Sequence, residues 1–231
     1  MKLSIILLVL VSIQETFLFA QISNETIQTR FSPSNGFERH SLTGFSHYLR
    51  SLPLKEPSAN VNYYNGEEKS NKAHAAVIDL DVGTRDLQQC ADAIMRLRAE
   101  YLYSIKQFDK IHFNFTNGFR CDFSEWMKGK RIHVNGNKIS WVQKVQPSNT
   151  YKNFRNYLTI IFSYAETLSL EKELKPVPIN NLQIGDIFIQ GGSPGHAILV
   201  VDVAIKPFYK RKSFSISSKL YACTRNPDTH K

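Results

Sequence analysis

The chain has 231 residues, of which 42% are hydrophobic and only 9 are proline, and its formal net charge is +9. This composition excludes an intrinsically disordered chain and allows one domain with a real hydrophobic core. The basic charge suits an anionic partner, but the lysines are scattered, and no zinc-finger, RNP-type or basic-helix motif is present. We therefore expect a globular domain with a solvated basic surface and no nucleic-acid partner.

The first residues predict a secretory signal peptide. Lys2 gives a short basic start, residues 3–11 are almost wholly apolar, and Ala20 is a small residue before a cleavage point at Gln21. The apolar run is too short for a membrane span, which needs about 20 residues, and no other stretch is long and apolar enough. We expect removal of residues 1–20 and an exported protein, periplasmic or secreted, without a membrane span.

After an irregular segment at residues 21–43, apolar periodicity and turn signals predict a series of helices and strands. In chain order these are a short helix capped by Ser41 and ending before Pro53, a strand at 75–82, a helix from 84 or 85 to 104, a strand at 111–115, a short helix from Asp122, a hairpin of 131–134 and 138–142, a helix at 151–167, and strands at 187–190 and 196–203.

The two long helices each carry one apolar stripe, and the last two strands are apolar and joined by a tight turn. These patterns predict an α+β fold in which an antiparallel sheet packs against two long helices. We expect a single domain over residues 44–212.

Three cysteines, Cys90, Cys121 and Cys223, cannot all pair within one chain, so an exported form would keep a free thiol. No CxxC or Cys/His cluster with zinc spacing is present. His74 lies just before the predicted strand 75–82, and Asp79 and Asp81 share one face of that strand, but no second histidine completes a metal site. We therefore expect no metal and no cofactor.

Residues 191–196 read GGSPGH, and the first five match G-x-S-x-G, the signature of a serine nucleophile. In that motif the amide after the serine helps to form the oxyanion hole, but here the next residue is Pro194, which has no N–H. A strand follows the turn instead of a helix. We therefore exclude Ser193 as a nucleophile and interpret the loop as a turn that precedes His196.

Residues 185–201, GDIFIQGGSPGHAILVV, resemble the hairpin G-D-[apolar]3…H-[apolar]-G/A-[apolar] of the NlpC/P60 and related papain-like cysteine hydrolases. In that superfamily the histidine begins a core strand and is the base for a cysteine on an upstream helix. The resemblance implies a papain-like fold, with Cys90 as nucleophile and His196 as base. It also implies an amide or cell-wall peptide as the substrate. A thiol needs such a base because it is only a few per cent thiolate at neutral pH.

A non-catalytic interpretation of Cys90 and His196 also stays open. If the helix starts at Thr84, Cys90 lies more than a turn inside it, on the apolar stripe, as a small core residue would. His196 would then be an ordinary residue at a strand end. The chain would be a non-catalytic envelope binding or structural protein with the same fold, in which the 191–195 loop forms part of a ligand cleft.

A third catalytic group is not evident in the sequence. Asp202 shares a strand face with His196, but six residues of strand span roughly 20 Å, so its carboxylate cannot reach the imidazole. We expect an orienting group from the next strand, within residues 212–221.

Four stretches carry a wider resemblance from about Gly44 onward: YLRSLPLK at 48–55, residues 74–103 with DLDVGTRDLQQCADAIMRLRAEYLY, VNGNKISWV at 134–142 and LQIGDIFIQGGSPGHAILVVDVA at 182–204. They are similar to the domain of unknown function 4846 family of exported bacterial proteins, common in Bacteroidetes. The resemblance implies no activity. After about Lys212 the chain departs from the family pattern, and we interpret residues 213–231 as an aberrant tail produced by a frameshift.

Overall fold

The computed structural model describes residues 25–207 and the backbone of residues 214–215. The predicted signal peptide, the tail with its predicted frameshift, and Cys223 lie outside the described residues, apart from the backbone of 214–215. The same holds for the orienting group expected within residues 212–221. In the part of the chain that is described, no helix is long and apolar enough to cross a membrane.

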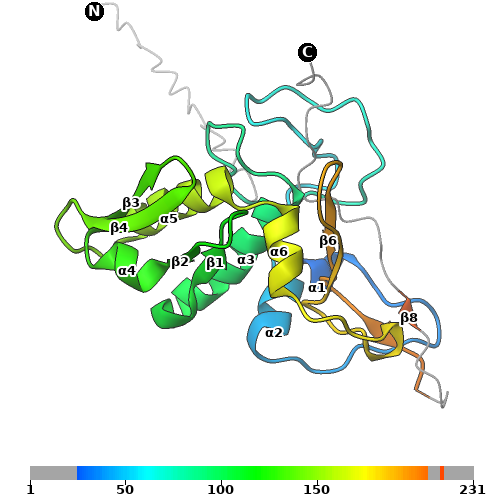
Figure 1. Ribbon diagram of the computed structural model, residues 1–231. Coiled ribbons are helices and arrows are strands. Elements are labelled where there is room, and N and C mark those ends of the chain that lie inside the picture. The colour runs from blue at the N-terminus through cyan, green and yellow to red at the C-terminus, as the bar shows by residue number, and fades with distance from the viewer. Residues whose placement is uncertain (1–24, 208–213, 216–231) are drawn as a thin grey trace, which may run out of the picture.

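The described residues form helices and short antiparallel strands, which confirms the predicted α+β class (Figure 1). The helices are α1 (Ile27–Arg30), α2 (Gly44–Arg50), α3 (Cys90–Ser104), α4 (Phe123–Met127), α5 (Tyr151–Tyr164) and α6 (Thr167–Glu173), with 3₁₀ turns η1 (Phe108–Lys110) and η2 (Ile179–Asn181). The strands form the antiparallel pairs β1 (His112–Asn114) with β2 (Arg120–Asp122), β3 (Lys130–Asn135) with β4 (Lys138–Gln143), β5 (Ile187–Gln190) with β6 (His196–Leu199), and β7 (Ala204–Ile205) with β8 (Phe214–Ser215).

The strands form separate two-stranded ladders among the described residues, not the single sheet that was expected. The predicted strand 75–82 is wrong: only Ile78 makes an isolated bridge, to Leu54. The amide of Leu80 donates to the carbonyl of Ile78 at 3.0 Å. This local turn uses backbone groups that a strand would present to a neighbour, so pairing cannot extend.

Helix α3 begins at Cys90, later than the sequence predicts. The residues before it have their own hydrogen bonds: the Gly83 amide donates to the Asp81 carboxylate at 2.8 Å, and the Gln88 side-chain amide donates to the Val82 carbonyl at 2.9 Å. The Gln89 amide donates to the side chain of Asp92 at 3.0 Å, which is one half of a capping box. Cys90 is therefore the first residue of the helix and does not lie a turn inside it.

The predicted helix 151–167 is two helices. Helix α5 ends at Tyr164, and Glu166 takes an extended conformation as the N-cap of α6. The Glu166 amide donates to the Ser169 hydroxyl at 2.9 Å. Helix α6 is an element that the sequence reading missed, and it becomes important because it packs against β5.

The two predicted hairpins are confirmed. In the first, Asn135 pairs with Lys138 around Gly136, whose φ of +56° is the left-handed conformation that a tight turn needs. In the second, Gln190 pairs with His196 across the GGSPG loop. Strand β6 ends at Leu199 and not at 203, and the Asp202 side chain beyond it binds two arginines.

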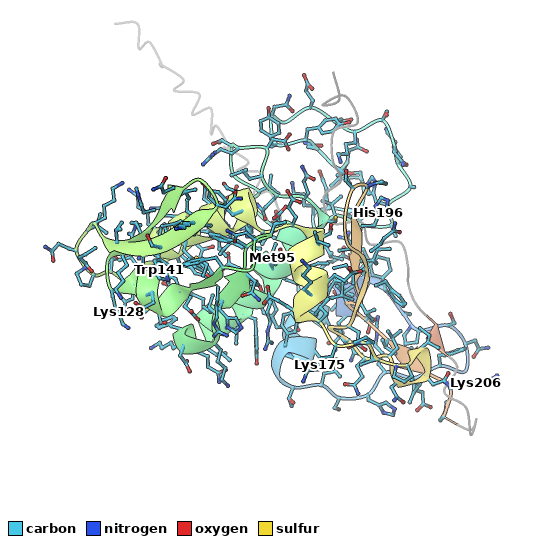
Figure 2. The ribbon with its side chains drawn as sticks, in the orientation of Figure 1. Met95, Lys128, Trp141, Lys175, His196 and Lys206 are labelled. Carbon is cyan, nitrogen blue, oxygen red and sulfur yellow. The ribbon has the colours of Figure 1, made fainter. Side chains whose placement is uncertain are left out.

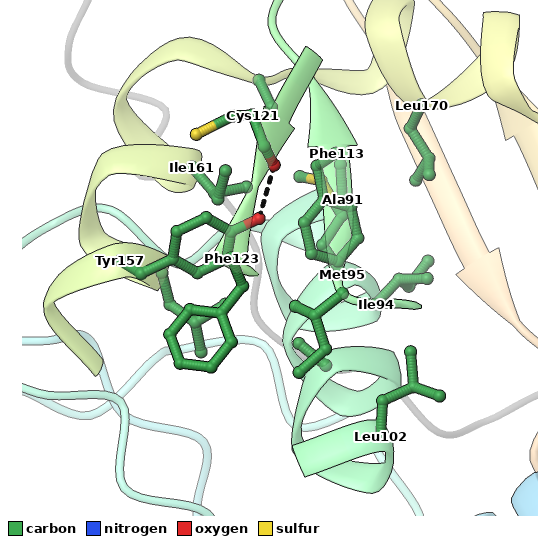
Figure 3. Close-up of a cluster of buried hydrophobic side chains, with 14 of the residues drawn as sticks. Ala91, Ile94, Met95, Leu102, Phe113, Cys121, Phe123, Tyr157, Ile161 and Leu170 are labelled. Carbon is green, nitrogen blue, oxygen red and sulfur yellow. Dashed lines mark hydrogen bonds between the residues drawn. The ribbon is translucent and has the colours of Figure 1, made fainter. Parts of the chain in front are cut away.

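The main hydrophobic core lies between α3, α5 and the strands β1, β2 and β6, and Figure 3 shows its centre. Met95 of α3 and Tyr157 of α5 are almost fully buried. The hydroxyl of Tyr157 donates to the backbone carbonyl of Cys121 at 2.7 Å, which satisfies the one polar atom of this side chain. A second, smaller cluster contains Ile27, Leu49, Leu52, Leu54, Ala76, Leu97 and Val201.

Candidate active site

Cys90 lies closer to the N-terminus of its helix than the sequence pattern predicted. It is the first residue of α3, is half-buried, and packs against the edge of the main core. The amides of the first helical turn have no partners within the helix, so this end of α3 favours negative charge. Cys121 is a different case, because its side chain is 0% exposed and burial raises the pKa of its thiol.

His196 is the first residue of β6, as predicted, and its side chain is exposed. The next residue, Ala197, is buried in the main core, and Leu199 packs against the same core. Successive side chains of a strand point to opposite faces. Strand β6 therefore presents Ala197 to helix α3, which packs against it, and places His196 on the outer face together with Ile198.

The sequence explains why His196 and the small residue Ala197 lie on opposite faces of β6. In the papain-like pattern the small residue comes two positions after the histidine, on the same strand face. Here Ala197 follows His196 directly, and the residue two positions later is Ile198, which is 50% exposed. The small side chain that faces α3 therefore lies on the opposite strand face from the histidine. No hydrogen bond joins Cys90 and His196, both of which are described residues.

The two residues nevertheless belong to the same end of the fold. Ala91 in the first turn of α3 and Leu170 of α6 belong to the same buried cluster. Burial, and after it the charge of Glu166 at the start of α6, raises the pKa of Asp92 in the first turn of α3. The Thr167 hydroxyl at the start of α6 donates to the carbonyl of Gly192 at 3.4 Å. The loop that contains Gly192 leads directly into His196. Figures 1 and 2 show α3, α6 and the end of the hairpin with His196 in this arrangement.

The glycines of GGSPGH are explained by contact with α6. A Cβ atom on Gly195 would lie 2.1 Å from the Thr167 hydroxyl oxygen, and one on Gly191 would lie 3.1 Å from the Cα atom of Leu168. The Gly191 amide also donates to the Glu171 carboxylate at 3.0 Å. The match to a serine motif is therefore a consequence of close helix packing. Sequence reasoning missed this contact because it missed α6, although LSLEKEL at 168–174 is a helix-favouring run.

Asp92 is a second residue that the sequence reading missed. Its side chain is 7% exposed, one carboxylate oxygen accepts from the Gln89 amide, and the other is buried without a hydrogen-bond partner. Burial raises the pKa of this carboxyl to about 7. The misplaced helix start concealed it, because a residue deep in a predicted helix has no capping role.

Asp202 does not contact His196, in agreement with the sequence prediction. Its carboxylate binds the guanidinium groups of Arg39 and Arg50, the latter at 2.8 Å. Among the residues that the structure describes, no three or more His, Cys, Asp or Glu side chains are grouped so that they could hold a metal ion.

Comparison with known proteins gives one match. Residues 27–221 match the family described as Domain of unknown function (4846), so the match continues past Lys212 into the segment predicted to be an aberrant tail. No curated protein and no solved structure matches the chain. Because the match covers most of the sequence, the chain belongs to the domain of unknown function 4846 family.

Proposed function

We propose that this chain is an exported, non-catalytic envelope protein that binds a cell-wall peptide on the outer face of the β5–β6 hairpin. One observation carries the proposal: β6 turns Ala197 toward α3 and the core, and His196 toward the outer face. In this function Cys90 is a small side chain at the edge of the core. The predicted signal peptide supports the location outside the cytoplasm.

The outer face has the chemistry of a small peptide site. Phe188 and Ile198 lie directly opposite each other on the two strands and are 41% and 50% exposed. The next pair along the hairpin is Gln190 and His196, whose side chains can donate and accept hydrogen bonds. An apolar side chain of the peptide would cover the Phe188–Ile198 pair, while its amides bond to the carboxamide and imidazole groups.

A second function, a papain-like thiol hydrolase of the cell envelope, is favoured by the position of Cys90 at the start of α3. The Cys90 sulfur would attack the carbonyl carbon of an amide, and the imidazole of His196 would take the thiol proton and return it to the departing amine. Water would then hydrolyse the thioester. This function requires the His196 side chain to turn from the outer face toward α3.

A single soluble peptidoglycan stem peptide tests both functions in one experiment. Binding to the purified full chain is measured by calorimetry, and cleavage of the same peptide by chromatography. For the binding function we expect affinity without cleavage. We also expect about a tenfold loss of affinity in Phe188→Ser, no loss in Cys90→Ala, and no loss in the control Val177→Ser, another exposed apolar residue.

Three other results would contradict the binding function or its location on the hairpin. Cleavage that is abolished in both Cys90→Ala and His196→Ala establishes the hydrolase and overturns the binding function. If the peptide is neither bound nor cleaved, both proposals are wrong. If Phe188→Ser and Val177→Ser lose affinity equally, the outer face of the hairpin is not the site.

A further inference from the structure

The basic residues were expected to be scattered, but the lysines and arginines are unevenly distributed along the chain. Residues 126–165, which we call the basic segment, contain seven Lys and Arg residues and no Asp or Glu. These residues are Lys128, Lys130, Arg131, Lys138, Lys144, Lys152 and Arg155. The basic segment runs from α4 through the β3–β4 hairpin to the end of α5, and these elements form one side of the molecule (Figure 1).

Part of this charge is neutralised within the fold. Glu125 accepts hydrogen bonds from Lys128 and Lys130, both at 2.5 Å, and Arg155 lies 3.5 Å from the Glu100 carboxylate. Lys138 and Lys144 are exposed and have no acidic partner among the described residues. Within the same described part of the chain, Lys152 of α5 is exposed without an acidic partner as well, so two of the three such lysines, Lys138 and Lys144, lie in β4 or directly after it.

The register of the hairpin arranges this charge in a row. Arg131, His133 and Asn135 alternate along β3, and Lys138 pairs with Asn135, so Arg131, His133 and Lys138 lie on one strand face. Successive members of such a row are roughly 7 Å apart. Arg131 is held at the base, where its guanidinium carbon lies 4.0 Å from the centre of the Trp126 ring. The guanidinium also donates to the Trp126 carbonyl at 3.0 Å and to the Asn153 side chain at 2.9 Å, so Arg131 adds positive charge to the base while exposed Lys138 is free to reach a ligand. Lys144 is beside the same base, because its amide donates to the Gly129 carbonyl.

The row fits an extended anionic polymer, and its neighbours select the class. The face that carries it also presents Ser140 and Val142 but no aromatic ring, whereas single-stranded nucleic acid is bound largely by base stacking. One exposed valine is too little apolar surface for insertion into a bilayer. Ser140, Asn135 and the imidazole of His133 instead offer hydrogen bonds to sugar hydroxyls. We propose that this face of the β3–β4 hairpin binds a linear acidic polysaccharide.

Fluorescent polygalacturonate, a carboxylate-bearing polysaccharide, tests the proposal with the full chain. We expect binding at low ionic strength that weakens as salt is added, because surface charges are screened. The double variant Lys138→Gln/Lys144→Gln should bind roughly tenfold more weakly, with the slope of log affinity against log salt reduced by about two. The matched control Lys72→Gln/Lys175→Gln loses the same net charge from exposed positions outside the basic segment, and should retain wild-type affinity within about twofold.

Three outcomes would overturn the proposal. The first is the absence of polygalacturonate binding by the wild type at low salt. The second is an equal loss of affinity in both double variants, which would mean that net charge alone and not the hairpin attracts the polymer. The third is tighter binding to a DNA oligonucleotide or to anionic phospholipid vesicles that is lost in Lys138→Gln/Lys144→Gln, which would assign the surface to another partner class.

Discussion

Replacement of Asp202 by asparagine is the strongest single test of the fold. The Asp202 carboxylate lies between two arginines: one oxygen accepts from Arg50 Nε at 2.8 Å, and the other accepts from Arg39 Nε at 2.8 Å. The side chains of Arg50 and Asp202 are only 6% and 10% exposed. The ion pairs of Asp202 join the segment after β6 to Arg50 in α2 and to Arg39 in the stretch before α2.

The expected cost follows from the charge that Asp202→Asn leaves behind. Removal of one partner from a buried ion pair typically costs about 3–5 kcal/mol, because the other charge stays buried without compensation. Arg50 keeps hydrogen bonds to the carbonyls of His40 and Val203, at 2.9 and 3.3 Å. We therefore expect the low end of that range, about 3 kcal/mol, which is a large part of the stability of an ordinary domain.

Urea denaturation followed by tryptophan fluorescence measures this change. Arg39→Gln should cost less than Asp202→Asn, because it leaves the more buried pair with Arg50 in place. The double variant should be less destabilised than the sum of the two single changes, since both remove the same interaction. Asp79→Asn, at an exposed carboxylate, is the control and should change stability by less than about 0.5 kcal/mol. An Asp202→Asn variant as stable as this control would refute the reasoning.

Three further changes probe the candidate site. Burial raises the pKa of Asp92 from 3.8 to about 7, so the folded protein holds a proton that the unfolded chain releases. The free energy of unfolding should therefore fall, on the order of 4 kcal/mol, as pH rises from about 4 to about 7, and Asp92→Asn should lose this dependence in denaturation midpoints measured across that range. Gly195→Ala should lower the free energy of unfolding by about 1–3 kcal/mol, because its Cβ would lie 2.1 Å from the Thr167 hydroxyl oxygen. An unchanged urea midpoint would contradict the docking of the loop on α6. In a Cys223→Ser background, a small thiol reagent should label half-buried Cys90 in the native protein and buried Cys121 only after unfolding, as peptide mass mapping would show. Labelling of both at the same rate without denaturant would argue against the core packing of β2.

Local patterns in the sequence determined the α+β class and both hairpins. The Asn135–Gly136 pair specifies a tight turn between alternating strands, and the apolar run after GGSPG specifies a strand that begins at His196. These signals are reliable because a turn and a strand depend mainly on residues close together in the chain. The candidate pair Cys90 and His196 also came from local patterns, namely a helix and a strand start.

Tertiary structure decided what those two residues face. Both faces of the β5–β6 hairpin are apolar, with Ile189 and Ala197 on one side and Phe188 and Ile198 on the other, so alternation alone cannot say which side is buried. Packing against α3 selects the side with Ala197.

The start of α3 was likewise decided by contacts that periodicity does not record. Arg96 of α3 donates to the carbonyl of Asp81 and to the Gln88 side chain, and so holds the preceding loop against the helix instead of letting it extend the helix. A sequence reading can identify a cysteine and a histidine with the right order and spacing. Only the packed core decides on which face of a strand a side chain lies, because the face is chosen by what the rest of the chain can bury.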